Sequence, residues 1–118
     1  MRTDEVESRV RREIERFRYE PPCHATIGVP WSRERVASEV ELLRASLITP
    51  QVATVEIADV GSPGPERDLW IVTKTLENGY LIVFDAEGDC FGLAVRGEIG
   101  IPQTLAIWGD LVHMFMSR

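Results

Sequence analysis

Residues 68–96 read Asp68-Leu-Trp-Ile-Val-Thr-Lys-Thr-Leu-Glu-Asn-Gly-Tyr-Leu-Ile-Val-Phe-Asp-Ala-Glu-Gly-Asp-Cys-Phe-Gly-Leu-Ala-Val-Arg96. Two turn signals divide this stretch into three apolar runs. Asn78-Gly79 favours a two-residue type I′ hairpin turn, because both central residues of that turn need a positive φ. Glu87-Gly88 favours a second tight turn. The stretch therefore predicts three antiparallel strands joined as a meander.

The two turns fix a register for these strands. A turn at Asn78-Gly79 pairs residue 77 with residue 80, and a turn at Glu87-Gly88 pairs residue 86 with residue 89. Because side chains alternate between the faces of a strand, these registers assign each residue to one face. One face collects an aromatic and branched set and predicts a core covered by helices: Ile71, Thr73, Tyr80, Ile82, Phe84, Phe91, Leu93 and Val95.

The opposite face is too apolar for a plain solvated surface, and it predicts an exposed apolar patch with a charged rim. Such patches often mark interaction sites. Trp70 is the preferred anchor, since Trp is enriched among binding hot spots, while Gly92 and Ala94 predict a shallow depression. The predicted binding residues are Trp70, Val72, Lys74, Leu76, Leu81, Val83, Asp85 and Arg96. Two alternatives stay open: the first helix or residues 20–31 cover this face, or it forms a homodimer seam.

The segments on either side of the meander predict three helices and one more strand. A helix over residues 4–19 begins at Asp4 and carries an apolar stripe, and a second over residues 33–47 has Ser32 as its N-cap. Residues 51–60 alternate in polarity, which predicts a half-buried strand. Thr104 caps a last helix that reaches Phe115, although Gly109 weakens it. The order is α-α-β-β-β-β-α: one α+β domain over residues 1–118, with a four-stranded antiparallel β-meander packed on one face by helices.

Composition narrows the class of function. The net charge is −6, and residues 51–118 carry all of it, because Arg and acidic residues balance over residues 1–50. An acidic sheet half argues against nucleic acid as a partner and is compatible with a basic protein. No apolar run approaches the roughly 20 residues of a membrane span, and the N-terminus lacks the apolar segment of a secretory signal. We therefore expect a cytoplasmic protein.

Catalytic and metal-binding patterns are weak. Cys23, His24, Cys90 and His113 are the soft ligands of the chain, but their spacing matches no zinc motif. A nucleophile pair of Cys23 or Cys90 with His113, oriented by Asp110, is conceivable. The acidic turn around Glu87 lacks the spacing of a calcium loop. We predict no metal and no cofactor.

These observations predict a small non-enzymatic module that binds another, basic protein through the second sheet face. Concrete versions are a bacterial toxin-neutralising (immunity-type) protein or a chaperone-like protein. The alternative is a self-associating domain with a small-ligand pocket between residues 20–31 and the sheet. An enzyme built on the Cys and His residues ranks third.

Overall fold

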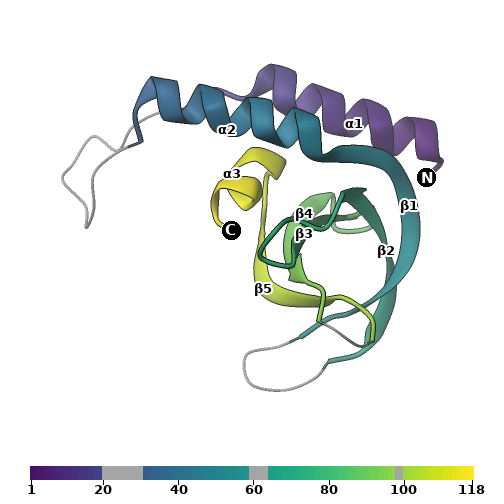
Figure 1. Cartoon of the computed structure of the whole chain (residues 1–118). Coiled ribbons are helices and arrows are strands. Elements are labelled where there is room, and N and C mark those ends of the chain that lie inside the picture. The colour runs from purple at the N-terminus through teal and green to yellow at the C-terminus, as the bar shows by residue number, and fades with distance from the viewer. Residues whose placement is uncertain (20–30, 59–63, 98–99) are drawn as a thin grey trace.

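The computed structural model describes residues 1–19, 31–58, 64–97 and 100–118. In this part of the chain the elements are α1 (Thr3–Arg16), α2 (Arg33–Ser46), β1 (Leu47–Glu56), β2 (Glu66–Thr73), β3 (Tyr80–Asp85), β4 (Cys90–Val95), β5 (Gln103–Gly109) and α3 (Leu111–Met116). The strands close into a barrel in sequence order, and the helices lie together on one side of it (Figure 1). The predicted α+β class and antiparallel meander are confirmed, but the described residues form five strands where four were predicted.

Barrel closure depends on a short contact between β1 and β5. Consecutive strands of a meander alternate in direction, so the first and fifth run the same way and meet in parallel. Glu56 pairs with Gln103, and its backbone N–H donates to the carbonyl of Pro102 over 2.9 Å. The N–H of Ala58 donates to Thr104 Oγ1 over 3.1 Å. Through this seam, one face of the predicted meander becomes the inside of the barrel.

The loop between β2 and β3 is longer by one residue than the predicted turn. Gly79 takes the left-handed conformation with φ of 83°, whereas Asn78 keeps a negative φ. The Leu76 N–H donates to the Tyr80 carbonyl over 2.8 Å, and the Gly79 N–H donates to the Leu76 carbonyl over 2.9 Å. The hairpin therefore has a three-residue loop with glycine in its last position, which is a common alternative to the type I′ turn.

This loop changes the register, and the predicted faces of β2 are wrong. Trp70 pairs with Phe84 and Ile71 with Val83, whereas the predicted turn places Trp70 opposite residue 87. Because the difference is an odd number of positions, every side chain of β2 moves to the other face of the sheet. The hydroxyl of Thr73 accepts the Ile82 N–H over 3.0 Å. A side-chain bond thus replaces a backbone bond where the ladder is interrupted.

The β3–β4 hairpin has the predicted register. Tyr80 pairs with Val95 and Phe84 with Phe91, and the two phenyl rings lie 4.8 Å apart between centroids. The residue with positive φ at this turn is Asp89, at 51°, rather than the glycine beside it. This aromatic cross-strand pair stabilises the outer face of the hairpin.

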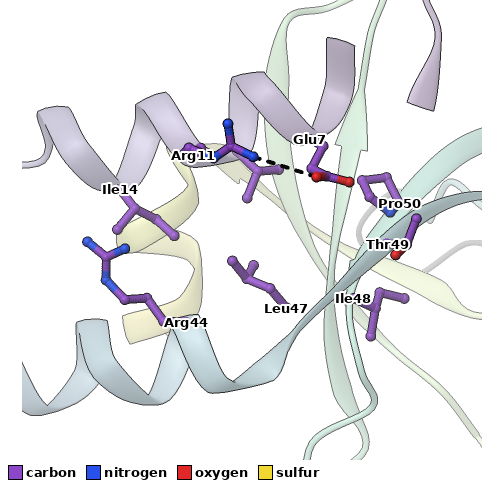
Figure 2. Close-up of a pocket in the computed structure, with 9 residues that line it drawn as sticks. Glu7, Arg11, Ile14, Arg44, Leu47, Ile48, Thr49 and Pro50 are labelled. Carbon is purple, nitrogen blue, oxygen red and sulfur yellow. Dashed lines mark ion pairs between the residues drawn. The ribbon is translucent and has the colours of Figure 1, made fainter. Parts of the chain in front are cut away.

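The first strand begins earlier than predicted, because α2 passes directly into it (Figure 2). Ser32 caps α2 as predicted, and its Oγ accepts the Arg35 N–H over 3.1 Å. Thr49-Pro50, a sequence signal for the end of the second helix, lies inside β1. A register irregularity between Leu47 and Gln51 accommodates it, since proline has no N–H to give to a regular ladder.

The predicted last helix divides into β5 and α3. The strand ends at Gly109, and Asp110 then caps α3 by accepting the His113 N–H over 3.2 Å. Between its two paired stretches with β4, the strand bulges outward at Ala106, which has a φ of 59°. The helical spacing of Leu105, Trp108, Val112 and Phe115 misled the prediction, because it ran across a strand end and a helix start.

The α1 helix runs over Thr3–Arg16, where residues 4–19 were predicted. Its cap is Arg2, whose backbone N–H donates to Glu5 Oε1 over 3.1 Å, rather than Asp4. Of the predicted stripe, Val6, Val10 and Ile14 are buried, whereas Phe17 lies just after the end of the helix and is half-buried. The sequence also allows a short edge strand over residues 25–29, which lie outside the described residues.

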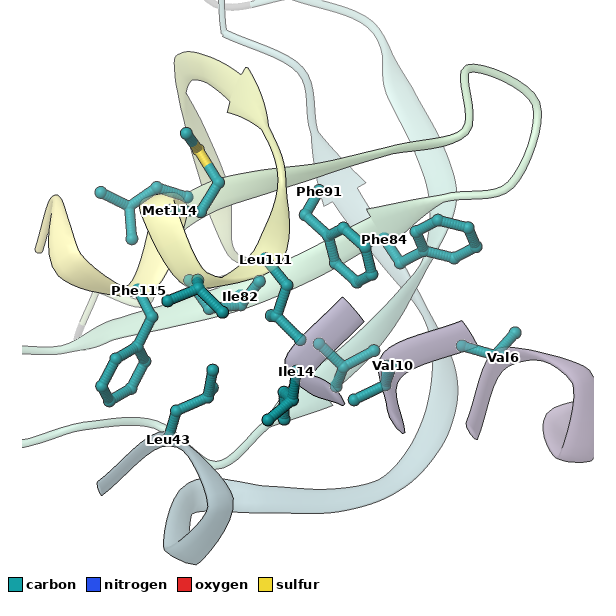
Figure 3. Close-up of a cluster of buried hydrophobic side chains, with 13 residues drawn as sticks. Val6, Val10, Ile14, Leu43, Ile82, Phe84, Phe91, Leu111, Met114 and Phe115 are labelled. Atoms are coloured by element: carbon teal, nitrogen blue, oxygen red, sulfur yellow. The ribbon is translucent and has the colours of Figure 1, made fainter. Parts of the chain in front are cut away.

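Two clusters of buried side chains support the fold. The inner core fills the barrel and consists of Val55, Leu69, Ile71, Leu81, Val83 and Ala94. The outer core lies between the outer face of β2–β4 and the helices (Figure 3), and consists of Val6, Val10, Ile14, Leu43, Val72, Ile82, Phe84, Phe91, Leu93, Leu111, Val112, Met114 and Phe115. Each face of the meander therefore has its own core.

Candidate functional site

The predicted binding patch is buried. Val72, Leu81 and Val83 are each 0% exposed. Leu81 and Val83 lie in the inner core, while Val72 lies in the outer core. The prediction that this face is exposed is wrong, because the sheet curls into a barrel and because the β2 register differs.

The remaining predicted binding residues do not gather into one patch. Trp70 and Leu76 are half-buried against the outer core. Lys74 and Arg96 are exposed, and Arg96 Nε donates to the Thr75 hydroxyl over 3.2 Å. The predicted depression at Gly92 is filled by the ring of Trp108, whose Cε3 lies 2.7 Å from where a Cβ on that glycine would stand.

Asp85 is the remaining predicted binding residue, and it forms an ion pair with Arg67 at one end of the barrel. The two guanidinium nitrogens of Arg67 donate to the two carboxylate oxygens of Asp85 over 3.1 and 3.2 Å, and one of them also donates to Glu87 over 3.1 Å. The hydrogen bonds to Asp85 and the negative charge of that carboxylate raise the pKa of Arg67. Such a bidentate pair is geometrically specific. Its partners are satisfied within the fold, so we assign it to stability.

The thiol of Cys90 lies beside this pair, and its surroundings do not activate it. Burial raises the pKa of Cys90, and the negative charges of Asp85 and Asp89 raise it further. A nucleophilic cysteine needs the opposite shift. Cys23 and His24 lie outside the described residues, and the described ones contain no group of three side chains that could hold a metal ion.

An exposed surface that the sequence analysis missed lies on the outward side of β1 and β2. We call it the β1–β2 face; it consists of Val52, Thr54, Glu56, Glu66, Asp68 and Trp70. Val52 is 55% exposed and pairs directly with the half-buried Trp70. The predicted alternation within residues 51–60 placed Thr54 and Glu56 on one side of the first strand, but no predicted register joined that side to Trp70 on β2.

Acidic side chains adjoin this apolar pair. The hydroxyl of Thr54 donates to Asp68 Oδ1 over 3.1 Å, and Glu56 is paired directly with Glu66. Like charges directly opposite each other on a sheet destabilise it. The β1–β2 face therefore combines an exposed apolar contact with carboxylates that would gain from a basic neighbour.

A hollow of about 430 Å³ lies between α1, the end of α2 and the start of β1 (Figure 2). Ile14, Leu47 and Ile48 are among its apolar lining, and Arg44 and Arg11 stand at its edge, as Figure 2 shows. Arg11 is paired with Glu7, with 3.6 Å between nitrogen and oxygen. The volume is that of a small-ligand site, but its polar groups do not converge on one point. The ligand pocket predicted beside residues 20–31 adjoins residues outside the described part of the chain.

A smaller, more polar pocket of about 280 Å³ lies between α1 and the start of α3. We call it the arginine pocket. It is lined by Arg9, Arg12, Glu13, Arg16, Phe17, Arg18, Asp110 and His113. In the sequence, His113 was paired only with a cysteine, and no function was predicted for the charges of the first helix. Residues of α1 and α3 are almost one hundred positions apart in the chain, so their spacing in the sequence does not indicate that the two helices pack side by side.

Comparison with known proteins identifies no relative. No family model, no curated protein and no solved structure matches this chain. In the described residues, each helix falls short of the length and apolarity that crossing a membrane requires. A function must therefore be argued from these surfaces alone.

Proposed function

We propose that this chain is a small non-enzymatic module that binds a basic segment of another protein through the β1–β2 face. The observation that carries the proposal is the pairing of exposed Val52 with half-buried Trp70 beside the facing pair of Glu56 and Glu66. Hot spots at interfaces favour a large aromatic anchor with apolar neighbours. Carboxylates at the rim would attract a basic partner and fix its orientation.

The charge distribution supports a basic partner over a second copy of the chain. Residues 51–118 carry the whole net charge of −6, and Arg67, the basic residue of β2, is engaged by Asp85 and Glu87. In a two-fold dimer the same patch meets itself. Dimerisation through this face would bring the carboxylates of Glu56 and Glu66 near their own copies.

A toxin-neutralising or chaperone-like protein is the concrete form of this proposal. An acidic binder that captures a basic protein and carries out no chemistry of its own suits either role. The role differs from the one expected from sequence only in the location of its surface, which moves from the buried sheet face to the outward side of β1 and β2.

The test is site-specific photo-crosslinking in the native cell. A photoreactive residue replaces Val52, and a matched control replaces Leu42, which is 46% exposed on α2. We expect a basic protein to be crosslinked from position 52 and not from position 42. Its binding to the purified chain should weaken at least tenfold with Glu66→Lys, which reverses one charge at the rim. Binding should also weaken with rising salt, because salt screens the rim charges. Equal crosslinking from both positions, or an acidic partner, would contradict the proposal.

A further inference from the structure

The arginine pocket contains more positive charge than its own carboxylates neutralise. Four of its side chains are arginines and two are acids. Glu13 is engaged by Arg9, with 2.6 Å between Oε1 and Nη1. Asp110 is engaged by His113, with 2.5 Å between Oδ1 and Nδ1. The pocket is therefore locally basic on a chain whose net charge is −6.

The remaining arginines are positioned close together around this pocket. Arg12 and Arg16 lie one turn apart on α1, and like charges at this spacing repel each other and destabilise a helix. Arg18 follows the end of α1, where its Nη1 donates to the carbonyls of Phe17 over 2.7 Å and Glu15 over 3.2 Å. These bonds hold its guanidinium near the pocket. An anion between the guanidiniums would remove the repulsion between Arg12 and Arg16.

The imidazole of His113 is held in a fixed orientation at the same pocket. Asp110 contacts Nδ1, and Phe17 packs edge-on against the ring at 5.4 Å between centroids. Because Nδ1 is engaged, Nε2 is the ring nitrogen left to reach a ligand. Asp110 is itself fixed as the N-cap of α3. The fold thus orients a second kind of hydrogen-bonding group toward the arginines.

We propose that the arginine pocket binds the phosphate group of a small phosphomonoester. Guanidinium groups bind phosphate oxygens through paired, charge-assisted hydrogen bonds. A tetrahedral dianion can accept from Arg12 and Arg16 at once, and also from Nε2 of His113 when both ring nitrogens carry a proton, whereas a planar carboxylate offers fewer acceptor directions. The volume of about 280 Å³ suits a phosphate with a short organic group.

The test is an NMR titration of the full chain with inorganic phosphate and with glycerol 3-phosphate, observing the backbone amides of α1 and the ring of His113. We expect saturable shifts confined to residues around the pocket, with tighter binding of the phosphomonoester than of acetate. The double variant Arg12→Gln/Arg16→Gln should weaken binding at least tenfold. Both residues are exposed, so the variant should fold, which far-UV circular dichroism would verify.

Arg11→Gln is the control for the single variants Arg12→Gln and Arg16→Gln, because it removes one positive charge from the same helix outside this pocket, and each of the two single variants should bind more weakly than it. Vesicles that contain phosphatidic acid distinguish a lipid headgroup from a free metabolite: vesicle binding with the same variant dependence supports the site and identifies a lipid source. Shifts that never saturate, or an equal loss of binding in the Arg11 variant, would overturn the proposal. Neither outcome bears on the β1–β2 face, whose test does not involve these residues.

Discussion

Replacing Gly92 by alanine should destabilise the barrel, because the space beside this glycine is occupied. A Cβ at this position would lie 2.7 Å from both Cε3 and Cζ3 of Trp108, whereas carbon atoms in contact are about 3.5–4.0 Å apart. The indole would have to retreat by about 1 Å inside a closed sheet. Overpacking of this kind costs about 1–3 kcal/mol, and stiffening of the unfolded chain offsets about 0.4–1 kcal/mol of it.

We therefore expect Gly92→Ala to lower the free energy of unfolding by about 1–2 kcal/mol, which corresponds to a fall in melting temperature of about 4–8 °C for a chain of this length. Urea unfolding followed by circular dichroism measures the change. Gly109→Ala is the control, since its Cβ would meet only the flexible end of Met114 at 3.2 Å. In a Trp108→Leu background the cost of Gly92→Ala should shrink by at least about 0.5 kcal/mol. Equal stability of Gly92→Ala and the wild type would refute the packing argument.

Two further predictions concern the inner core and the thiol at the end of the barrel. Val83→Asp places a carboxylate where the side chain is 0% exposed. It should abolish cooperative unfolding, because an unpaired buried charge costs several kcal/mol. The control Val52→Asp, at a position that is 55% exposed, should leave the melting curve unchanged. The pKa of Cys90 is raised in the folded chain above an ordinary value of 9.0, so the folded state binds the thiol proton more tightly than the unfolded state does. The stability that this tighter proton binding contributes is complete below pH 9.0 and is lost as the pH rises through the folded pKa. Denaturation measured from pH 7 to pH 11 should show a steeper loss of stability in the wild type than in Cys90→Ala, and parallel curves would contradict the assignment.

The sequence predicted the elements of the meander because their signals are local. Alternation and turn residues located β2, β3 and β4, and the β3–β4 register followed directly from the position of its turn. The three apolar residues of the first helix, Val6, Val10 and Ile14, are buried as their spacing indicated.

The errors arose where one residue of loop length decides the outcome. Asn78-Gly79 fits both a two-residue turn and the end of a three-residue loop, and the choice between them exchanges the two faces of β2. Barrel closure is a pairing between distant segments, so no local pattern reports it. The apolar second face was a correct observation for β3 and β4, but there it belongs to the inner core rather than to a binding surface.

The candidate sites were hidden for the same reason. Val52 and Trp70 meet only when β1 and β2 pair in the observed register, and the arginine pocket exists only because α3 packs beside α1. Sequence spacing gives the faces of single elements, whereas these surfaces depend on which elements become neighbours.

The parallel seam between β1 and β5 bears on the order in which the chain folds. The other strand pairs join neighbours along the chain, but Glu56 and Gln103 are separated by all of β2, β3 and β4. The entropy of closing so long a loop is lost before the contact returns any energy, and non-local pairings of this kind slow folding. The two hairpins and the outer core can assemble without the seam, so we expect barrel closure to come last. An open, curled sheet with its apolar side uncovered is then the final intermediate, and the speed of closure limits how long that surface is available for aggregation.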